Sequence, residues 1–225
     1  MSHEAETSGA GRPALSRERI LQAALALIDE EGTGGFTMRE LSTRMGYTDM
    51  ALYKYVANRD EVIDGVLELL LGTVALPGAE EGDWEERLGA ALRSLFALFR
   101  AHPRALPALL ERPLHLPAIA RGYADARDML AAAGLDTPDI AGIMATLSAY
   151  TLGYATLLCG GFFTQVRLPA PERTRSRRRR SDRCPALLTD SDWDALSDRF
   201  DTGLTAILTG LRVTYGQSAS PAARA

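Results

Sequence analysis

The residues best suited to chemistry lie in one segment near the N-terminus, FTMRELSTRMGYTDMALYKYVANRDEV, which runs from residue 36 to residue 62. Gly46 and Tyr47 divide it into two short amphipathic stretches. Apolar side chains recur where they would pack these stretches across each other as helices: Leu41, Met45, Leu52 and Val56. Such a pair is typical of a helix-turn-helix, whose second helix enters the major groove of DNA. The predicted chemistry is therefore DNA recognition, and the alternative is a plain pair of packed helices.

The second stretch presents polar, aromatic and basic side chains on its outward side. These outward residues would be Asp49, Met50, Ala51, Tyr53, Lys54 and Tyr55. Lysine and tyrosine hydroxyls at such a position suit contacts to phosphates, which fix the register of a protein on DNA without reading sequence. Arg39, in the first turn of the preceding helix, could donate two hydrogen bonds to a guanine edge. We therefore expect base reading from Arg39 and backbone contacts from the helix that follows.

Capping residues predict the helices that must hold these side chains. Ser16 is a suitable N-cap, and the sequences Thr37–Glu40 and Asn58–Glu61 both fit a capping box. Glycines at residues 32 and 46 follow apolar-periodic stretches and are expected to end helices. The four expected helices span residues 16–31, 37–45, 49–56 and 58–71. Residues 15–72 are therefore expected to form a helical domain without strands.

Residues 15–72 resemble the DNA-binding domain of the tetracycline-repressor (TetR) family. The resemblance is carried by ILQAALALIDEEG, FTMRELSTRMG and ALYKYVANRDEVIDGVL. The pattern Tyr-x-Tyr-Val-x-Asn-Arg-Asp-Glu is most similar to the branch that includes the tetracycline repressor itself. The resemblance implies an all-helical homodimer with a variable C-terminal domain that binds a small effector. No cofactor is expected.

By position in that family, Arg39 resembles the base-reading arginine. Thr37, Thr48, Tyr53 and Arg59 match positions that usually contact phosphates. The complete set of expected DNA contacts is Thr37, Met38, Arg39, Thr48, Asp49, Met50, Ala51, Tyr53, Lys54, Tyr55 and Arg59.

Asp49 departs from the amide that the tetracycline repressor has at this position. A carboxylate would repel phosphate and could accept a hydrogen bond only from cytosine N4. The operator is therefore expected to differ from that repressor's.

Residues 73–217 have the apolar periodicity of a second, larger helical domain. Alanine and leucine dominate and aromatic residues are only 7%, which favours helix over sheet. Five helices are expected, over residues 84–100, 103–110, 117–133, 138–162 and 191–215. Residues 1–14 and 218–225 are expected to be disordered tails. Residues 164–190, which contain Arg177–Arg180, are interpreted as a flexible loop, with an auxiliary nucleic-acid arm as the alternative.

The last two long helices carry apolar stripes that could form a four-helix dimer seam. The residues expected there are Tyr150, Trp193, Phe200, Leu204, Ile207 and Leu211. The alternative is that the stripes face the core of their own subunit. The residues proposed for an effector pocket are Phe99, His102, Tyr123, Tyr150 and Tyr154, although aromatic residues of a helical core give the same pattern.

Other classes of protein find no support in the sequence. His102 and His115 have no acidic partner at a metal-like spacing, and Cys159 and Cys184 form no zinc or disulfide pattern, so no metal is expected. Nucleophile–base pairs and glycine-rich phosphate loops are not found, which disfavours an enzyme. No signal peptide or membrane span is recognised, so a cytoplasmic protein is expected.

The leading hypothesis is a dimeric regulator that binds a palindromic DNA operator as a repressor and is released by a small-molecule effector. The histidines of the tetracycline repressor's drug-and-magnesium site cannot be aligned here, which disfavours tetracycline as the effector. The alternative is an effector-independent DNA-binding regulator or activator.

Overall fold

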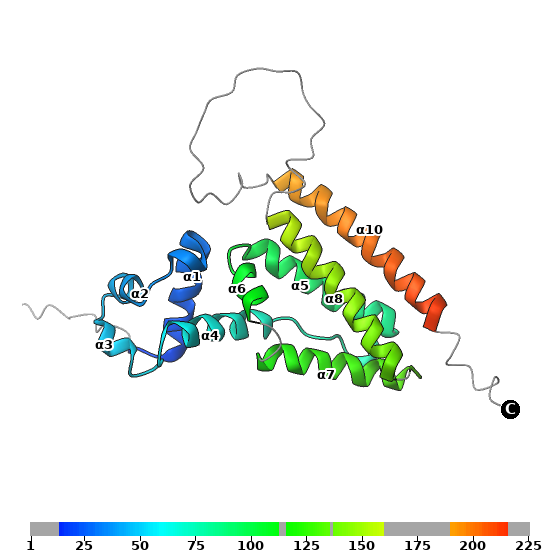
Figure 1. Cartoon of the computed structure of the whole chain (residues 1–225), viewed down its shortest axis with the longest axis horizontal. Helices are drawn as coiled ribbons and strands as arrows, with labels where there is room; N and C mark the ends of the chain where they lie inside the picture. Colours follow the sequence, from blue (N-terminus) through cyan, green and yellow to red (C-terminus); the bar gives the residue numbers. More distant parts are fainter. Residues whose placement is uncertain (1–13, 113–115, 136, 160–189, 216–225) are drawn as a thin grey trace, which may run out of the picture.

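The computed structural model describes residues 14–112, 116–135, 137–159 and 190–215, and within these ranges the chain is helical with no strand. Figure 1 shows a small group of helices at the N-terminal end joined by one helix to a larger group of long helices. The elements are α1 (Arg17–Gly35), α2 (Met38–Met45), α3 (Asp49–Leu52), α4 (Arg59–Leu71), the short 3₁₀ helix η1 (Ala79–Glu81), α5 (Trp84–Ala101), α6 (Leu106–Glu111), α7 (Pro117–Ala132), α8 (Thr137–Cys159) and α10 (Asp190–Tyr215). The predicted all-α fold class is confirmed.

Helices α1 to α4 form the N-terminal group, which we call the reading head. Side chains of Ser16, Thr37 and Asn58 cap α1, α2 and α4 as predicted, each accepting a hydrogen bond from a backbone N–H three residues later. Large side chains from all four helices meet with almost no exposure, and they include Ile20, Leu27, Leu41, Leu52 and Ile63. The head is thus a small core closed by local caps.

Two predicted helix ends differ from the structure. The backbone leaves the helical region at Gly32, which has a φ of 76°, but α1 resumes and continues to Gly35. The sequence predicts a third helix that reaches about Val56, yet α3 ends at Leu52 and the chain turns tightly, with Tyr55 N donating to Leu52 O at 2.9 Å. This turn buries Val56, which is 2% exposed, and leaves the two tyrosines between them in solvent.

The C-terminal group is built from long helices packed along each other. Helices α5, α8 and α10 contact one another in every pairing, α7 packs against α4, α5 and α8, and α4 links the two groups (Figure 1). The observed bounds agree with the predicted helices to within a few residues, and α6 begins three residues later than expected. The expected tails and the arginine-rich loop lie outside the described residues, except for residues 14 and 190 at their borders. His115 also lies outside them.

Helix α8 is unusually apolar for a packed helix. By length and composition alone, its segment Pro138–Leu158 could cross a membrane, with a mean hydropathy of 1.3. However, one of its faces carries Ile143, Leu147 and Leu158 into the core, where each is at most 3% exposed. Only 28% of the apolar segment is buried within the chain, so α8 also presents a weakly polar face outward.

Candidate nucleic-acid interface

The turn between α2 and α3 is held by short-range contacts. The Thr37 hydroxyl accepts from Glu40 N at 3.1 Å and begins α2, while Gly46 ends it in the left-handed region with a φ of 72°. Tyr47 N then donates to Ser42 O at 2.9 Å. A left-handed C-cap favours glycine, because a Cβ there meets the neighbouring carbonyl. The angle between the two helices is therefore fixed by the local sequence.

A buried serine joins α2 to α3. The hydroxyl of Ser42, which is 3% exposed, lies within hydrogen-bonding distance of both the Arg39 carbonyl and a carboxylate oxygen of Asp49. Its single proton is donated best to the charged acceptor. The sequence places Asp49 on the outward side, but this contact ties its carboxylate back to α2. The residue is half-buried, and it positions α3 rather than standing free on its surface.

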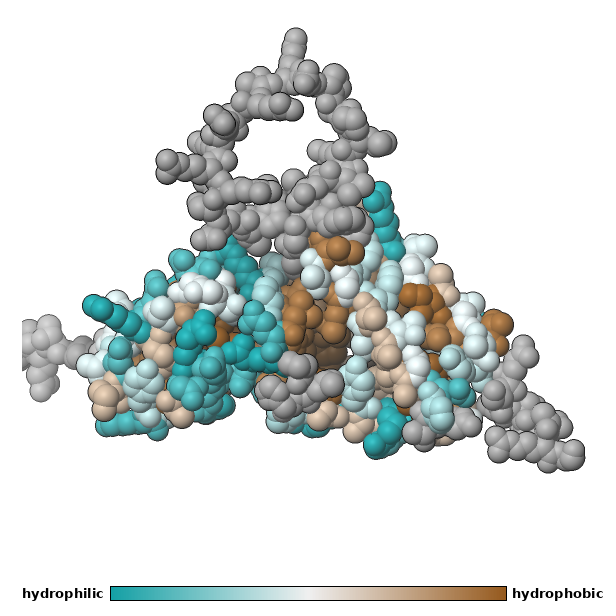
Figure 2. All heavy atoms as spheres, in the orientation of Figure 1, coloured by the Kyte–Doolittle hydropathy of each residue, from teal (hydrophilic) through white to brown (hydrophobic). Residues whose placement is uncertain are grey.

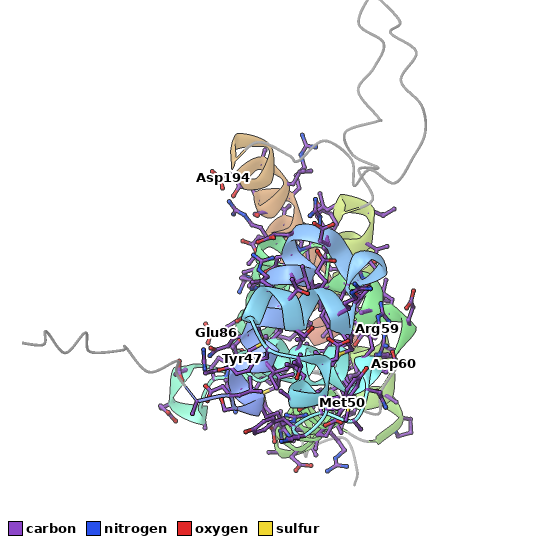
Figure 3. The ribbon with its side chains drawn as sticks, turned by 90° about the vertical axis from the view of Figure 1, so that its left-hand side faces the viewer. Tyr47, Met50, Arg59, Asp60, Glu86 and Asp194 are labelled. Atoms are coloured by element: carbon purple, nitrogen blue, oxygen red, sulfur yellow. The ribbon has the colours of Figure 1, made fainter. Side chains whose placement is uncertain are left out.

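The side chains that do point outward from α3 and the following turn are apolar, aromatic and basic. Met50 is 74% exposed, and Tyr53 and Tyr55 are 44% and 42% exposed. Lys54 is exposed beside them, and Arg39 is exposed on α2. Figure 3 views the molecule from this end, with Tyr47, Met50, Arg59 and Asp60 labelled around the head.

Arg39 lines an open hollow of about 570 Å³ on the surface of α2, together with Thr37, Glu40, Thr43 and Arg44. Within the described residues, neither Arg39 nor Lys54 forms an ion pair, whereas Arg44 on the same helix is paired with Glu30. These two cations are therefore available to an anionic partner. Ala51 is only partly exposed, and Thr48 is exposed with a hydroxyl that makes no capping hydrogen bond.

Two of the expected DNA contacts take part in the internal packing of the head. Met38 is 7% exposed and belongs to the core of the head, because it is the first residue of α2 and faces inward. Arg59 donates from Nε to Phe36 O at 2.9 Å and from a terminal nitrogen to Thr33 O. Its guanidinium also lies 5.8 Å from the centre of the Phe36 ring. Arg59 therefore ties the start of α4 to the end of α1 and to Phe36, which follows it.

The residues expected to form an effector pocket make contacts in several parts of the C-terminal group. Tyr150 and Tyr154 donate their hydroxyls to Phe200 O and Leu196 O, at 2.9 and 3.0 Å, and so fasten α8 to α10. Phe99 is 4% exposed, and the Tyr123 hydroxyl lies 2.6 Å from Ser148 Oγ. Desolvation raises the pKa of both Tyr150 and Tyr154 above the ordinary phenol value.

Two expected dimer residues are buried in their own chain. Phe200 is 1% exposed and stacks on Phe96 with ring centres 4.1 Å apart, and Leu204 is 0% exposed. The aromatic cluster formed by Phe96, Tyr150, Tyr154 and Phe200 joins α5, α8 and α10. This part of the stripe faces its own core, which corrects the prediction for Phe200 and Leu204. Tyr150 is partly exposed, and its hydroxyl is bonded to α10. Ile207 and Leu211 are partly exposed, and the Trp193 side chain lies outside the described residues.

The final expected pocket residue, His102, connects the two groups of helices. Its Nδ1 lies 2.9 Å from an Asp29 carboxylate oxygen at the end of α1. Arg104 donates to the backbone oxygens of Asp29, at 3.0 Å, and of Glu30. Glu30 in turn holds Arg44 of α2, whose guanidinium lowers the pKa of that carboxylate. The segment that precedes α6 therefore contacts the head at α1, through His102 and Arg104.

The other end of α6 is also attached to the head. Arg112 pairs with Asp60 at 2.6 Å and with Asp64 at 2.7 Å, both on α4. Further along α4, Glu68 accepts from Ala118 N of α7 at 2.7 Å. Figure 2 shows a hollow lined by hydrophobic side chains in the middle of this face, beside α6 as located in Figure 1. A six-residue helix next to an apolar hollow is thus linked at both ends to the reading head.

The fold and this face define a helix-turn-helix DNA-binding protein, and comparisons with known proteins give its family. Residues 20–66 match the bacterial regulatory proteins of the tetR family, and residues 76–215 match the tetracyclin repressor-like C-terminal domain. The chain belongs to the TetR family of bacterial transcriptional regulators.

Individual relatives align over most of the chain. It is 28% identical to the HTH-type transcriptional repressor DrrR1 of Streptomyces coeruleorubidus, over 92% of this chain and 80% of that protein. It is 29% identical to an HTH-type transcriptional regulator of Saccharopolyspora erythraea, over 91% of this chain and 88% of that protein. The structure of ActR from Streptomyces coelicolor in complex with actinorhodin superposes with a TM-score of 0.66 and 27% identity, covering 90% of this chain and 99% of that one.

Proposed function

We propose that this protein is a homodimeric transcriptional repressor in the bacterial cytoplasm, without enzymatic activity, that binds a palindromic operator and is released by a small-molecule effector. The observation that carries the proposal is the position of α6, which lies beside an apolar hollow and is tied to the reading head at both ends. Similar proteins support it, since DrrR1 is named a repressor and ActR has been solved with actinorhodin.

Release would follow from movement of α6. A ligand that filled the hollow and displaced α6 would act on α4 through Arg112 and on α1 through His102 and Arg104. A ligand shifts such an equilibrium only by its difference in affinity for the two states. The attachment at both ends makes the position of α6 and the orientation of the head strongly dependent on each other.

The dimer seam belongs on the outward faces of α8 and α10. Small residues recur there at four-residue spacing, and all are exposed: Ala141, Ala145, Ala149 and Gly153 on α8, and Ala206 and Gly210 on α10. Small side chains let two helices approach closely, and a second copy would cover the apolar segment of α8 that the chain leaves largely unburied. This face replaces the buried stripe around Phe200 and Leu204.

Operator selection tests the DNA-binding half of the proposal. The full-length protein would be used to enrich binding sites from random double-stranded DNA. We expect a palindrome whose half-sites are separated by about one helical turn, roughly 34–36 Å, or somewhat more. Enrichment of single half-sites would contradict a dimer, and no enrichment at all would contradict sequence-specific binding.

The dimer seam is tested by Ala149→Glu. A carboxylate in the middle of the proposed seam should produce monomers by sedimentation, and these monomers should keep the helical content of the wild type in circular dichroism, although they unfold at a lower temperature than the dimer. The variant Leu204→Glu should instead unfold the chain, because Leu204 is buried and an unpaired charge is strongly disfavoured in an apolar core. A dimeric Ala149→Glu protein would show that the seam lies elsewhere.

Effector release is tested with actinorhodin and with a set of apolar ring compounds as probes. A true effector should raise the thermal unfolding temperature and at the same time lower operator affinity. Arg104→Ala should keep the thermal shift but weaken the release, whereas Arg127→Ala on the exposed face of α7 serves as the matched control. Compounds that stabilise the protein without releasing DNA would favour the effector-independent alternative.

A further inference from the structure

Met50 is the most exposed large apolar side chain in the described part of the molecule, at 74%. Met50 is the second residue of α3, at the end of the molecule formed by the reading head (Figure 3). Apolar side chains in water forgo the stabilisation that burial brings. A partner that covers this side chain would supply that stabilisation.

The geometry of α3 sets the direction of Met50. Successive residues of an α-helix are about 100° apart, so Met50 is about 200° from Leu52. Leu52 is 0% exposed and anchors α3 in the core, which places Met50 on the opposite face. Ser42 holds Asp49, the preceding residue, against α2. The orientation of α3 about its axis is therefore fixed by Leu52 in the core and by the contact between Asp49 and Ser42, and Met50 projects away from both.

The chemistry of the major groove leaves one partner for such a side chain. Base edges there present hydrogen-bond donors and acceptors, and the only apolar group among them is the C5-methyl of thymine. Met50 has no hydrogen-bond donor and only a weakly accepting sulfur. Arg39, exposed on α2, is suited to the opposite task of binding a guanine edge.

We propose that Met50 reads a thymine methyl group in each operator half-site, and that Asp49 positions α3 rather than reading a base. This inference rests on the proposed function, because it requires that α3 enters the major groove. It names the kind of base that the protein recognises: a 5-methylpyrimidine opposite Met50.

Deoxyuridine substitution tests the proposal directly, because it removes only the methyl group and keeps every hydrogen bond of the base pair. Each thymine of the selected operator would be replaced in turn, and the affinity of the full-length protein measured at fixed salt. We expect one thymine per half-site whose replacement weakens binding about fourfold, as for one methyl group returned to water. Replacement of the other thymines should change the affinity by less than that.

Variants of Met50 assign the effect to this side chain. Met50→Ala should bind thymine and deoxyuridine operators equally, Met50→Leu should keep the preference, and Met50→Gln, of similar length but polar, should lose it. All three should unfold at the wild-type temperature, because the residue is exposed. A preference for thymine that persists in Met50→Ala would assign the methyl group to another residue.

Two outcomes would refute the inference about Met50 and leave the proposed function standing, and a third would refute the proposed function itself. Specific operator binding with no sensitivity to any deoxyuridine would refute methyl reading alone. A uniform loss on cognate and scrambled DNA in Met50→Ala would show that Met50 contacts the sugar–phosphate backbone. Failure to select any operator would instead refute the proposed function.

Discussion

The reading head and the aromatic cluster behind it are stabilised by contacts of very different range. In the head, the capping and turn contacts join residues three to seven positions apart, as between Thr37 and Glu40 or Ser42 and Asp49, and its longer contacts, such as Arg59 to Phe36 across 23 positions, stay within the same short domain. In the cluster, Tyr150 reaches a residue 50 positions away, and the nearby ion pair Arg93–Asp201 spans 108. The head carries its partners within its own short sequence, whereas the cluster exists only once three distant helices have met.

This difference predicts where substitutions affect stability and where they affect function. Outward residues of the head, such as Met50 and Lys54, take no part in its core and can be replaced without unfolding it. Residues of the cluster are buried or partly buried and are shared among α5, α8 and α10. Changes there should alter the stability of the chain long before they alter a DNA contact.

The largest expected effect is that of Phe200→Ala. Removing a buried ring that stacks on Phe96 should lower the free energy of unfolding by about 3–5 kcal/mol. Urea unfolding followed by circular dichroism measures it. Met50→Ala is the control from the other region and should change that free energy by no more than about 0.5 kcal/mol. Equal effects of the two substitutions would remove the distinction between the regions.

Arg39→Ala should have the next largest effect, on DNA binding rather than on stability. We expect a loss of roughly 1–3 kcal/mol on the selected operator and relaxed preference at one base pair per half-site. Arg127→Ala, on the exposed face of α7, is the control. Anisotropy titrations with cognate and scrambled DNA distinguish the roles, because an equal loss on both would mean that Arg39 contacts phosphate only.

Tyr154→Phe isolates one hydrogen bond of the cluster. Removal of its bond to Leu196 O should lower the free energy of unfolding by about 1 kcal/mol. Because burial raises its pKa in the folded state, the phenol also favours folding below pH 10.0, the ordinary value, and that contribution is lost as the pH rises further. Unfolding titrations at rising pH should show a smaller decline in Tyr154→Phe, and an unchanged decline would contradict this. Tyr55→Phe, in the exposed turn of the head, is the control.

The smallest effect is expected for Lys54→Ala, which removes an exposed charge from the head. Affinity should fall alike on all DNA sequences, and the slope of log affinity against log salt should fall by roughly 1 for each phosphate that the lysine no longer neutralises. Affinity measured at several salt concentrations tests this. An unchanged slope would place Lys54 outside the DNA interface, and an unchanged melting temperature would confirm that the residue is not structural.

The sequence by itself determined the elements of the head. The N-caps Ser16, Thr37 and Asn58 and the C-cap Gly46 act on neighbours within a few residues, so their patterns identify α1, α2 and α4 directly. The family resemblance carried by these residues is confirmed over both parts of the chain. The predicted end of α3 was less accurate, because the turn at Tyr53 follows from the burial of Val56 rather than from a capping residue.

Tertiary structure decided which face of each element is used. The stripe that contains Phe200 and Leu204 has the same periodicity whether it faces its own core or a second subunit, and only the packing of α5 against α10 shows that it is buried in its own chain. His102 and Arg59 look free in the sequence, yet their partners, Asp29 and Thr33, come from elements far along the chain. The spacing of apolar residues shows which side of a helix is apolar. It does not show what that side packs against, because the packing partners lie far away in the sequence.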